Sequence, residues 1–189
     1  MPMRHLMMLP IAAALAACQA GDAGNGTAGN GQDAGQRQAA RTIGETAGQT
    51  ADLAQFNRAV EAAGLTETLR GAGPYTVFAP VNAGFDRVPQ DTRTLLMGPE
   101  GREQLTELLT YHIVPGVVTA QDLTRAMERG QGRTTLSTVS GGNLTVSREG
   151  NVLVISDAAG GRARVSAADQ IQSNGVIHHI DAVLMPTAP

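Results

Sequence analysis

The two halves of this 189-residue chain differ in the spacing of their apolar residues. From about Thr46 to Gly130, apolar residues recur every three or four positions, as they do in helices with one buried face. After Gly130 the chain consists of short runs rich in Val, Ile, Leu and Thr, separated by Gly-Gly, Glu-Gly-Asn and Asn-Gly breaks that favour tight turns. A helical first half and a meander of antiparallel strands in the second half, around one core, define an α+β domain.

The helical half also contains one strand. All five aromatic residues lie between Phe56 and Tyr111, so the strand-rich half must fill its core with Val, Ile and Leu. The expected elements are a helix over 50–63 that ends at Gly64, a strand over 75–79, a short helix over 82–85 capped by Asn82, two helices within 91–110 separated at Gly98-Pro99, and a helix over 119–128 capped by Thr119.

The first 18 residues have the layout of an export signal. A short polar start precedes an apolar run, Leu6 to Leu15, that is too short to span a bilayer as a mature helix. The run ends in Leu-Ala-Ala-Cys, which resembles the bacterial lipobox, and Cys18 is the only cysteine of the chain. The alternative is an ordinary signal peptide followed by an unrelated cysteine. We expect residues 1–17 to be removed and Cys18 to be lipidated, because acyl chains hold a protein stably on a membrane.

The segment after Cys18 lacks the residues from which a core is built. Gln19 to Arg41 contains no Leu, Ile, Val or aromatic residue, so it cannot bury enough surface to offset its ordering entropy. We therefore expect 18–41 to be a lipidated cysteine with a disordered tether, and 42–189 to be the folded domain. The expected location is the cell envelope, with the outer membrane or the periplasm more consistent than the cytoplasm.

Composition and spacing argue against several kinds of chemistry. The net charge of −3 is too mild and of the wrong sign for a nucleic-acid platform. His178 and His179 are neighbours on an expected strand, so we expect one to face inward and the other to be solvated, and they cannot easily chelate one metal. His112, His178 and Asp181 could meet as a metal trio, but no spacing fixes their geometry. We expect no metal, no cofactor and no enzyme activity.

Three stretches, taken in order, resemble the motifs of the fasciclin domain. They are YTVFAPVNAGF (75–85), LLTYHIVPG (108–116) and NGVIHHIDAVLMP (174–186). The resemblance covers about Thr46 to Pro186. It implies a wedge of two antiparallel β-sheets with several helices packed on it, in a secreted or surface-anchored protein that serves in adhesion and matrix contacts.

Two departures from the family pattern limit what the resemblance implies. Val81 stands where the first motif usually has Thr or Ser. The Asp-Ile pair that some animal members use in integrin binding is interrupted here as Asp169-Gln170-Ile171, and the chain has no Arg-Gly-Asp. Integrin-type binding is therefore not expected.

The motifs mark seven residues as an interaction or structural motif: Thr76, Asn82, Tyr111, His112, Asn174, Gly175 and His178. Tyr111 and His112 lie where an expected helix turns into a strand. His112 shares a helical face with Leu105, Leu108 and Leu109, whereas Tyr111 shares a strand face with Ile113. Three interpretations stay open for this pair: a core tyrosine beside a hydrogen-bonded core histidine, an exposed contact epitope, or a catalytic pair.

The sequence thus favours a membrane-anchored extracytoplasmic protein that mediates cell-surface adhesion or contacts with matrix or protein, without catalysis. The partner would be a surface protein or glycan of unknown identity. The alternative is a module of the cell envelope that binds a small apolar ligand between sheet and helices. An open polar face would favour adhesion, whereas an aliphatic pocket would favour the ligand.

Overall fold

The structure, a computed structural model, describes residues 40–186. The expected signal segment, Cys18 and nearly all of the expected tether lie outside the described residues. The helices are α2 (Ile43–Gln49), α3 (Ala54–Ala63), α4 (Thr66–Arg70), α5 (Asn82–Asp86), α6 (Gln90–Met97), α7 (Arg102–Tyr111) and α8 (Ala120–Arg129), with 3-10 turns at η1 (Ala51–Leu53) and η2 (Pro99–Gly101). None of the helices in the described part is long and apolar enough to cross a bilayer.

Seven strands are hydrogen-bonded to one another in the order β2-β1-β7-β6-β5-β4-β3. They are β1 (Tyr75–Pro80), β2 (Ile113–Pro115), β3 (Arg133–Ser137), β4 (Asn143–Glu149), β5 (Val152–Ser156), β6 (Arg162–Gln172) and β7 (Gly175–Ile180). Strand β6 belongs to two sheets, because Arg162 to Arg164 pair with β5 and Val165 to Gln172 pair with β7. The helical first half and the strand-rich second half confirm the α+β fold.

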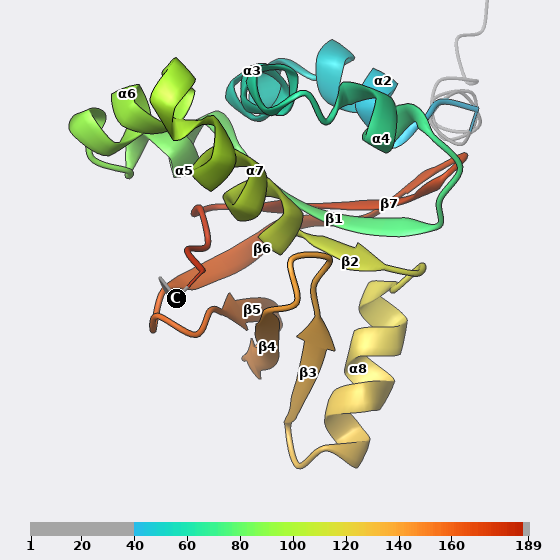
Figure 1. Cartoon of the computed structure of the whole chain (residues 1–189). Helices are drawn as coiled ribbons and strands as arrows, with labels where there is room; N and C mark the ends of the chain where they lie inside the picture. Colours follow the sequence, from blue (N-terminus) through green and yellow to red (C-terminus); the bar gives the residue numbers. More distant parts are fainter. Residues whose placement is uncertain (1–39, 187–189) are drawn as a thin grey trace, which may run out of the picture.

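One strand pairing departs from the expected antiparallel pattern. The meander from β3 to β7 is antiparallel throughout, as predicted, but β1 runs parallel to β7. Parallel neighbours need a long crossover between them, and here most of the domain lies between the two strands. The first and last strands of the domain therefore lie side by side in its centre (Figure 1).

Strands β1 and β7 are buried on both faces. On one face, Val77, Ala79 and Ile177 pack against α2, α3 and α7 in the first core cluster. On the other face, Phe78 and Ile180 pack with side chains of α8, β4 and β5 in the second cluster. Figure 1 shows this layering, with the α2 to α7 helices above the β1/β7 pair and α8 with β3 to β5 below it.

Most of the expected elements occur where the apolar spacing placed them. Helix α3 ends at Gly64, whose φ of 76° is left-handed and suits glycine. Helix α8 begins with the expected cap at Thr119, which is part of a capping box: Thr119 accepts from the Asp122 N–H, and Asp122 accepts from the Thr119 N–H. Helix α2 was not expected, because only Ile43 and Ala47 give it an apolar face.

Candidate functional site

Tyr111 lies in the interior and not on the surface. Its ring packs against the backbone at Gly142, where a Cβ atom would collide with the ring. Its hydroxyl donates to the Asn143 carbonyl at 2.8 Å and accepts from the Ala158 N–H at 3.3 Å. The hydroxyl therefore joins helix α7 to the turns on either side of β4 and β5, and burial raises its pKa.

His112 is fully buried directly beyond α7. Its Nδ1 donates to the Leu108 carbonyl at 2.8 Å, and its Nε2 accepts from the Leu184 N–H at 3.1 Å. Burial lowers the pKa of His112 to about 4, against weaker opposing effects of the Leu108 bond and the Asp157 charge. The ring is neutral at physiological pH, and both of its nitrogens are occupied by backbone groups.

The expected strand face shared by Tyr111 and Ile113 does not exist. Helix α7 continues through Tyr111, and His112 is its C-cap. Tyr111 therefore belongs to the second core cluster and Ile113 to the first. The two-residue alternation of strands begins only at Ile113, two residues too late to place both side chains on one face.

Thr76 and His178 hold the backbone of a single residue, Val118, in the segment between β2 and α8. Thr76 Oγ1 accepts from the Val118 N–H at 2.8 Å, and His178 Nε2 donates to the Val118 carbonyl at 2.9 Å. His178 Nδ1 accepts from the Asp169 N–H, and its ring stacks on Phe78 with the centroids 5.3 Å apart. Burial lowers the pKa of His178 as well. These two side chains fix the entry into α8.

Asn82 is not the N-cap of α5, contrary to the prediction. The N-cap is Val81, and Asn82 is the first helical residue. The Asn82 side chain instead donates to the Ala51 carbonyl and accepts from the Gln55 N–H, at 2.8 and 2.9 Å. The Gln55 N–H lies in the first turn of α3, where it has no partner within the helix. Asn82 therefore caps a neighbouring helix across the fold.

Asn174 caps two helices at once. Its Oδ1 accepts from the Ile43 N–H at the start of α2, and its Nδ2 donates to the Leu69 and Gly71 carbonyls at the end of α4, all at 2.8 Å. Its own carbonyl accepts from the Tyr75 N–H at the start of β1. One side chain thus joins the beginning of the domain to its closing strand.

Gly175 follows Asn174 directly, and a residue with a side chain does not fit at this position. Its φ is 152°, in the region that favours glycine, and a Cβ atom there would collide with the Tyr75 carbonyl. The close approach lets β7 begin beside β1 in register with it. The Asn-Gly pair of the third motif is therefore explained by packing of the backbone.

His179 is buried, although we expected one histidine of the 178–179 pair to be solvated. The two side chains do point to opposite faces of β7, but both of these faces are covered. His179 is 7% exposed, and its Nε2 has no hydrogen-bond partner among the described residues. Desolvation lowers its pKa, with the Asp52 carboxylate acting in the opposite direction.

The structure does not bring His112, His178 and Asp181 together as metal ligands. The ring nitrogens of both histidines bind separate backbone groups. Asp181 accepts from the Arg164 N–H and pairs with Arg87 at 3.4 Å. Among residues 40–186, no three His, Cys, Asp or Glu side chains form a cluster that could hold a metal ion.

Six of the seven motif residues are buried and Asn82 is half-buried, so the further candidate sites are two features of the surface. The first is the outer face of β3 to β6, here called the polar sheet face. Strand register places its exposed and half-buried polar residues in cross-strand rows, in which Val152 and Val154 of β5 are the apolar members. They are Arg133, Thr135, Ser137, Asn143, Thr145, Ser147, Glu149, Ser156, Arg162 and Arg164.

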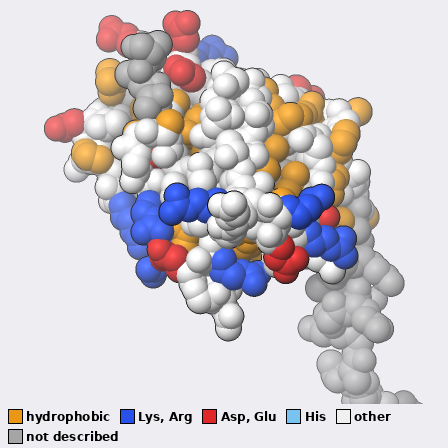
Figure 2. Space-filling view, turned by 90° about the horizontal axis from the view of Figure 1, so that it is seen from below, with side chains coloured by type: hydrophobic (Ala, Val, Ile, Leu, Met, Phe, Trp, Pro, Cys, Tyr) orange, Lys and Arg blue, Asp and Glu red, His pale blue; other side chains and the backbone are white. Residues whose placement is uncertain are grey.

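The polar sheet face carries more positive than negative charge. Glu149 pairs with Arg162 and, at 3.9 Å, with Arg164, whereas Arg133 has no ion pair among the described residues. Figure 2 views the molecule from the end where α8 and β3 to β5 lie, and arginine and acidic side chains gather there among uncharged groups. The alternation of polar with apolar residues in β3 and β4 is the sequence signal that could have indicated this face.

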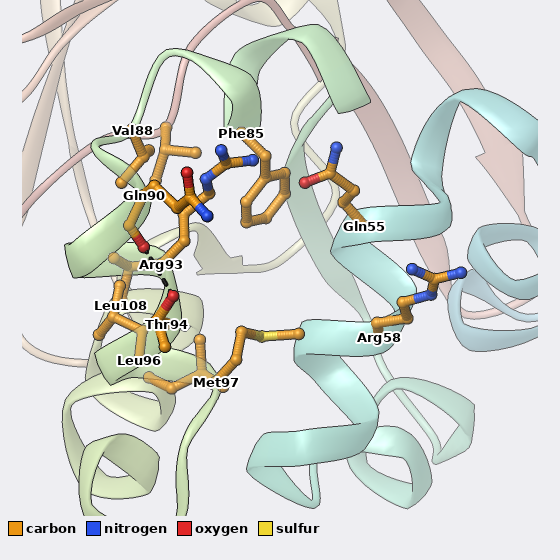
Figure 3. Close-up of a pocket in the computed structure, with 12 residues that line it drawn as sticks. Gln55, Arg58, Phe85, Val88, Gln90, Arg93, Thr94, Leu96, Met97 and Leu108 are labelled. Carbon is orange, nitrogen blue, oxygen red and sulfur yellow. Dashed lines mark hydrogen bonds between the residues drawn. The ribbon is translucent and has the colours of Figure 1, made fainter.

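The second feature is a cavity of about 530 Å³ between α3, α5, α6 and α7 (Figure 3). Apolar side chains supply most of its lining: Phe85, Val88, Leu96, Met97, Leu105, Leu108 and Val183. Two arginines, Arg58 and Arg93, also line it, and no acidic residue does. The sequence offered no signal for this site, because its residues come from four helices whose relative positions only the fold sets.

The fold and these motif residues define a domain family. The fasciclin domain model matches residues 51–186, and the chain belongs to this family. Protein sll1483 of Synechocystis sp. is 38% identical over 148 residues, which cover 78% of this chain and 74% of that protein.

Other relatives contain the domain within longer chains. Transforming growth factor-beta-induced protein ig-h3 of Sus scrofa is 34% identical over 128 residues, covering 68% of this chain but only 17% of that protein. The solved structure of a FAS1 domain pair from the insect cell adhesion molecule Fasciclin I is 19% identical, with a TM-score of 0.58. It covers 79% of this chain and 51% of that one, and it shows that the fold is shared.

Proposed function

We propose that this chain is an exported, lipid-anchored fasciclin protein that mediates cell-surface contact through its polar sheet face and performs no catalysis. The observation that supports the proposal most is the division of roles among its polar groups. The family-motif side chains bind backbone groups in the interior, whereas the polar sheet face presents hydroxyl, amide and guanidinium groups to solvent.

Such a face suits recognition of a surface protein or glycan. Hydroxyl and amide groups both donate and accept hydrogen bonds, and arginine side chains bind carboxylates in bidentate geometry. The excess of arginine over glutamate favours an acidic partner. The adhesion role named for the insect relative is consistent with this proposal.

Cell attachment tests the contact face directly. A variant carrying Thr135→Ala, Thr145→Ala and Arg162→Ala should lose attachment with an unchanged melting temperature, because the three side chains are exposed or half-buried and exposed ion pairs stabilise folds little. The matched control carries Gln121→Ala, Arg125→Ala and Glu128→Ala on the exposed side of α8, and it should attach like wild type. Normal attachment of the first variant would overturn the assignment of this face.

The anchor is tested separately at Cys18, which lies outside the described residues. Cys18→Ser should abolish incorporation of labelled fatty acid and release the protein from the membrane fraction, because the cysteine thiol is the expected acylation site. Equal labelling of wild type and variant would refute lipidation without bearing on the polar sheet face.

A further inference from the structure

Helix α6 is the one helix in the described part of the chain that buries no residue. Its sequence nevertheless includes Leu95, Leu96 and Met97, and Leu95 and Met97 are 57% and 44% exposed. A helix in a globular domain is normally held by an apolar face packed on the core. Here the space under α6 is the cavity of about 530 Å³, so α6 covers an unfilled apolar site.

The arginines of the cavity are arranged to receive an anion. Arg93 uses Nη1 to bind Asp86 at 3.1 Å, while its Nε is buried without a hydrogen-bond partner. Asp86 is also held by Gln55 Nε2 at 3.1 Å, which fixes the far side of the guanidinium. The Nε edge of the guanidinium therefore lacks a partner among the described residues, and a small shift of the side chain would open it to a bidentate carboxylate.

Arg58 adds a second positive charge on the opposite side of the cavity. It projects from α3, is exposed, and forms no ion pair with any described residue. Figure 3 shows Arg58 and Arg93 on different helices, with Met97 reaching between α6 and α3. An anion in this site would be attracted by the charge of Arg58 and by Arg93, whose charge is partly balanced by Asp86 outside the lining.

We propose that the cavity binds a single-chain fatty carboxylate, with its head group on Arg93 and its acyl chain against Phe85, Leu105 and Leu108. The volume lies within the usual range for small-molecule sites, roughly 300 to 1,000 Å³. A mostly apolar lining with an arginine on each side matches an amphipathic anion better than a neutral oil or a sugar. The ligand would supply the apolar contacts that α6 lacks. This site lies on the helical side of the domain and is independent of the polar sheet face.

Titration calorimetry with decanoate and the full chain tests the proposal. We expect saturable binding at one site, with affinity rising about fourfold for each added methylene up to dodecanoate while the chain still fits. Decanol and decyltrimethylammonium should bind at least about tenfold more weakly, since they cannot pair with the guanidinium. Equal affinity for the anionic and cationic amphipaths, or no saturable binding of decanoate, would overturn the proposal.

Variants locate the site. Arg93→Gln should weaken decanoate binding at least about tenfold, and Arg58→Gln should weaken it less and mainly at low salt. Thr94→Trp, at an exposed position on the lining, should obstruct the cavity without disturbing the core. The matched control is Arg125→Gln on α8. If Arg93→Gln unfolds the domain, Arg58→Gln and Thr94→Trp still test the site. Decanoate binding as tight as in wild type by both of these variants would refute it.

Discussion

The imidazole of His112 joins helix α7 to the last segment of the domain, because its Nε2 accepts a hydrogen bond from the N–H of Leu184, 72 residues further along the chain. A backbone N–H can only donate, so Nε2 must be unprotonated. The proton therefore lies on Nδ1, which donates to the Leu108 carbonyl. A neutral histidine is built into the connection between these two parts of the fold.

Removing this connection should destabilise the domain. His112→Ala leaves the Leu108 carbonyl and the Leu184 N–H without their partner, and a buried unsatisfied group costs roughly 1 to 3 kcal/mol. Urea denaturation of wild type and variant measures the difference in the free energy of unfolding. An exposed contact role predicts the reverse, namely lost attachment with unchanged stability, and that result would contradict the buried geometry.

Two substitutions of Tyr111 distinguish the contribution of ring packing from that of hydrogen bonding. Tyr111→Ala should cost about 3 to 5 kcal/mol, because it removes a large buried ring. Tyr111→Phe keeps the ring and removes only the hydroxyl bonds to Asn143 and Ala158, so it should cost less. Chemical denaturation of the two variants gives the order. Equal losses would show that the hydroxyl, and not the ring, carries the stability.

The domain should become less stable as pH falls from about 6.5 to about 4. In this range the unfolded chain binds a proton at His112 that the folded domain does not bind, because burial lowers the folded pKa to about 4. The effect is absent above pH 6.5, where both states are neutral, and it stops growing below pH 4. The total loss is about 3 kcal/mol.

Two further histidines act in the same direction. Burial also lowers the pKa values of His178 and His179, so they add to the loss. His112→Gln is the control, since it should be less stable at pH 7 but show a shallower decline towards pH 4. Other titrating groups affect both proteins alike. A parallel decline in wild type and His112→Gln, measured by urea denaturation at several pH values, would exclude His112 as a source.

Loss of the Asn174 side-chain N–H donors should destabilise the domain. Asn174→Asp retains an acceptor for the Ile43 N–H but turns an oxygen towards the Leu69 and Gly71 carbonyls. We expect a loss of at least about 1 to 3 kcal/mol, larger than that of an exposed control such as Asn151→Asp in the turn between β4 and β5. Thermal melts compare the two, and similar melting temperatures would mean that the Asn174 contacts contribute little.

Helix α2 should be part of the folding unit even though the family match begins at residue 51. A chain that starts at Ala40 keeps the buried Ile43 and Ala47, whereas one that starts at Thr50 loses both and leaves Asn174 Oδ1 unpaired. The first should melt like the exported chain and the second clearly lower. Equal melting of both shortened chains would show that α2 only rests on the domain.

The apolar periodicity predicted the fold class because each predicted element has several core residues. Helix α3 occurs as expected, since its buried side chains repeat at the helical period. Strand β1 also occurs as expected, although it is buried along almost its whole length and not on alternate residues. Helix α2 and the parallel β1–β7 pairing were beyond this reasoning. Helix α2 depends on its N-terminal cap and on the burial of Ile43 and Ala47, which is too few residues to show a period. The β1–β7 pairing depends on which strands become neighbours, and the spacing of apolar residues within a strand does not determine that.

The motif residues were identified from the sequence, but their partners were not. Asn82 was expected to cap its own helix and caps α3 instead, because the unpaired Gln55 N–H lies within its reach in the fold. His179 was placed correctly on the opposite face from His178, yet the expected solvation failed because helices cover that face. Long-range hydrogen bonds and the burial of a central strand both depend on tertiary packing.

Strand β6, which is 11 residues long, runs from the proposed contact face to the point where the chain enters the domain. In an anchored adhesin these would be the two points of pulling. Arg162 and Arg164 lie on the polar sheet face at its beginning. At its other end, the Ser173 N–H donates to the Arg41 carbonyl at 2.7 Å, where the chain enters the domain. If the proposed contact face and anchor are correct, a tensile load would run along β6 and then cross to Arg41 through hydrogen bonds such as Ser173–Arg41, so these contacts at the entry of the chain would bear it first.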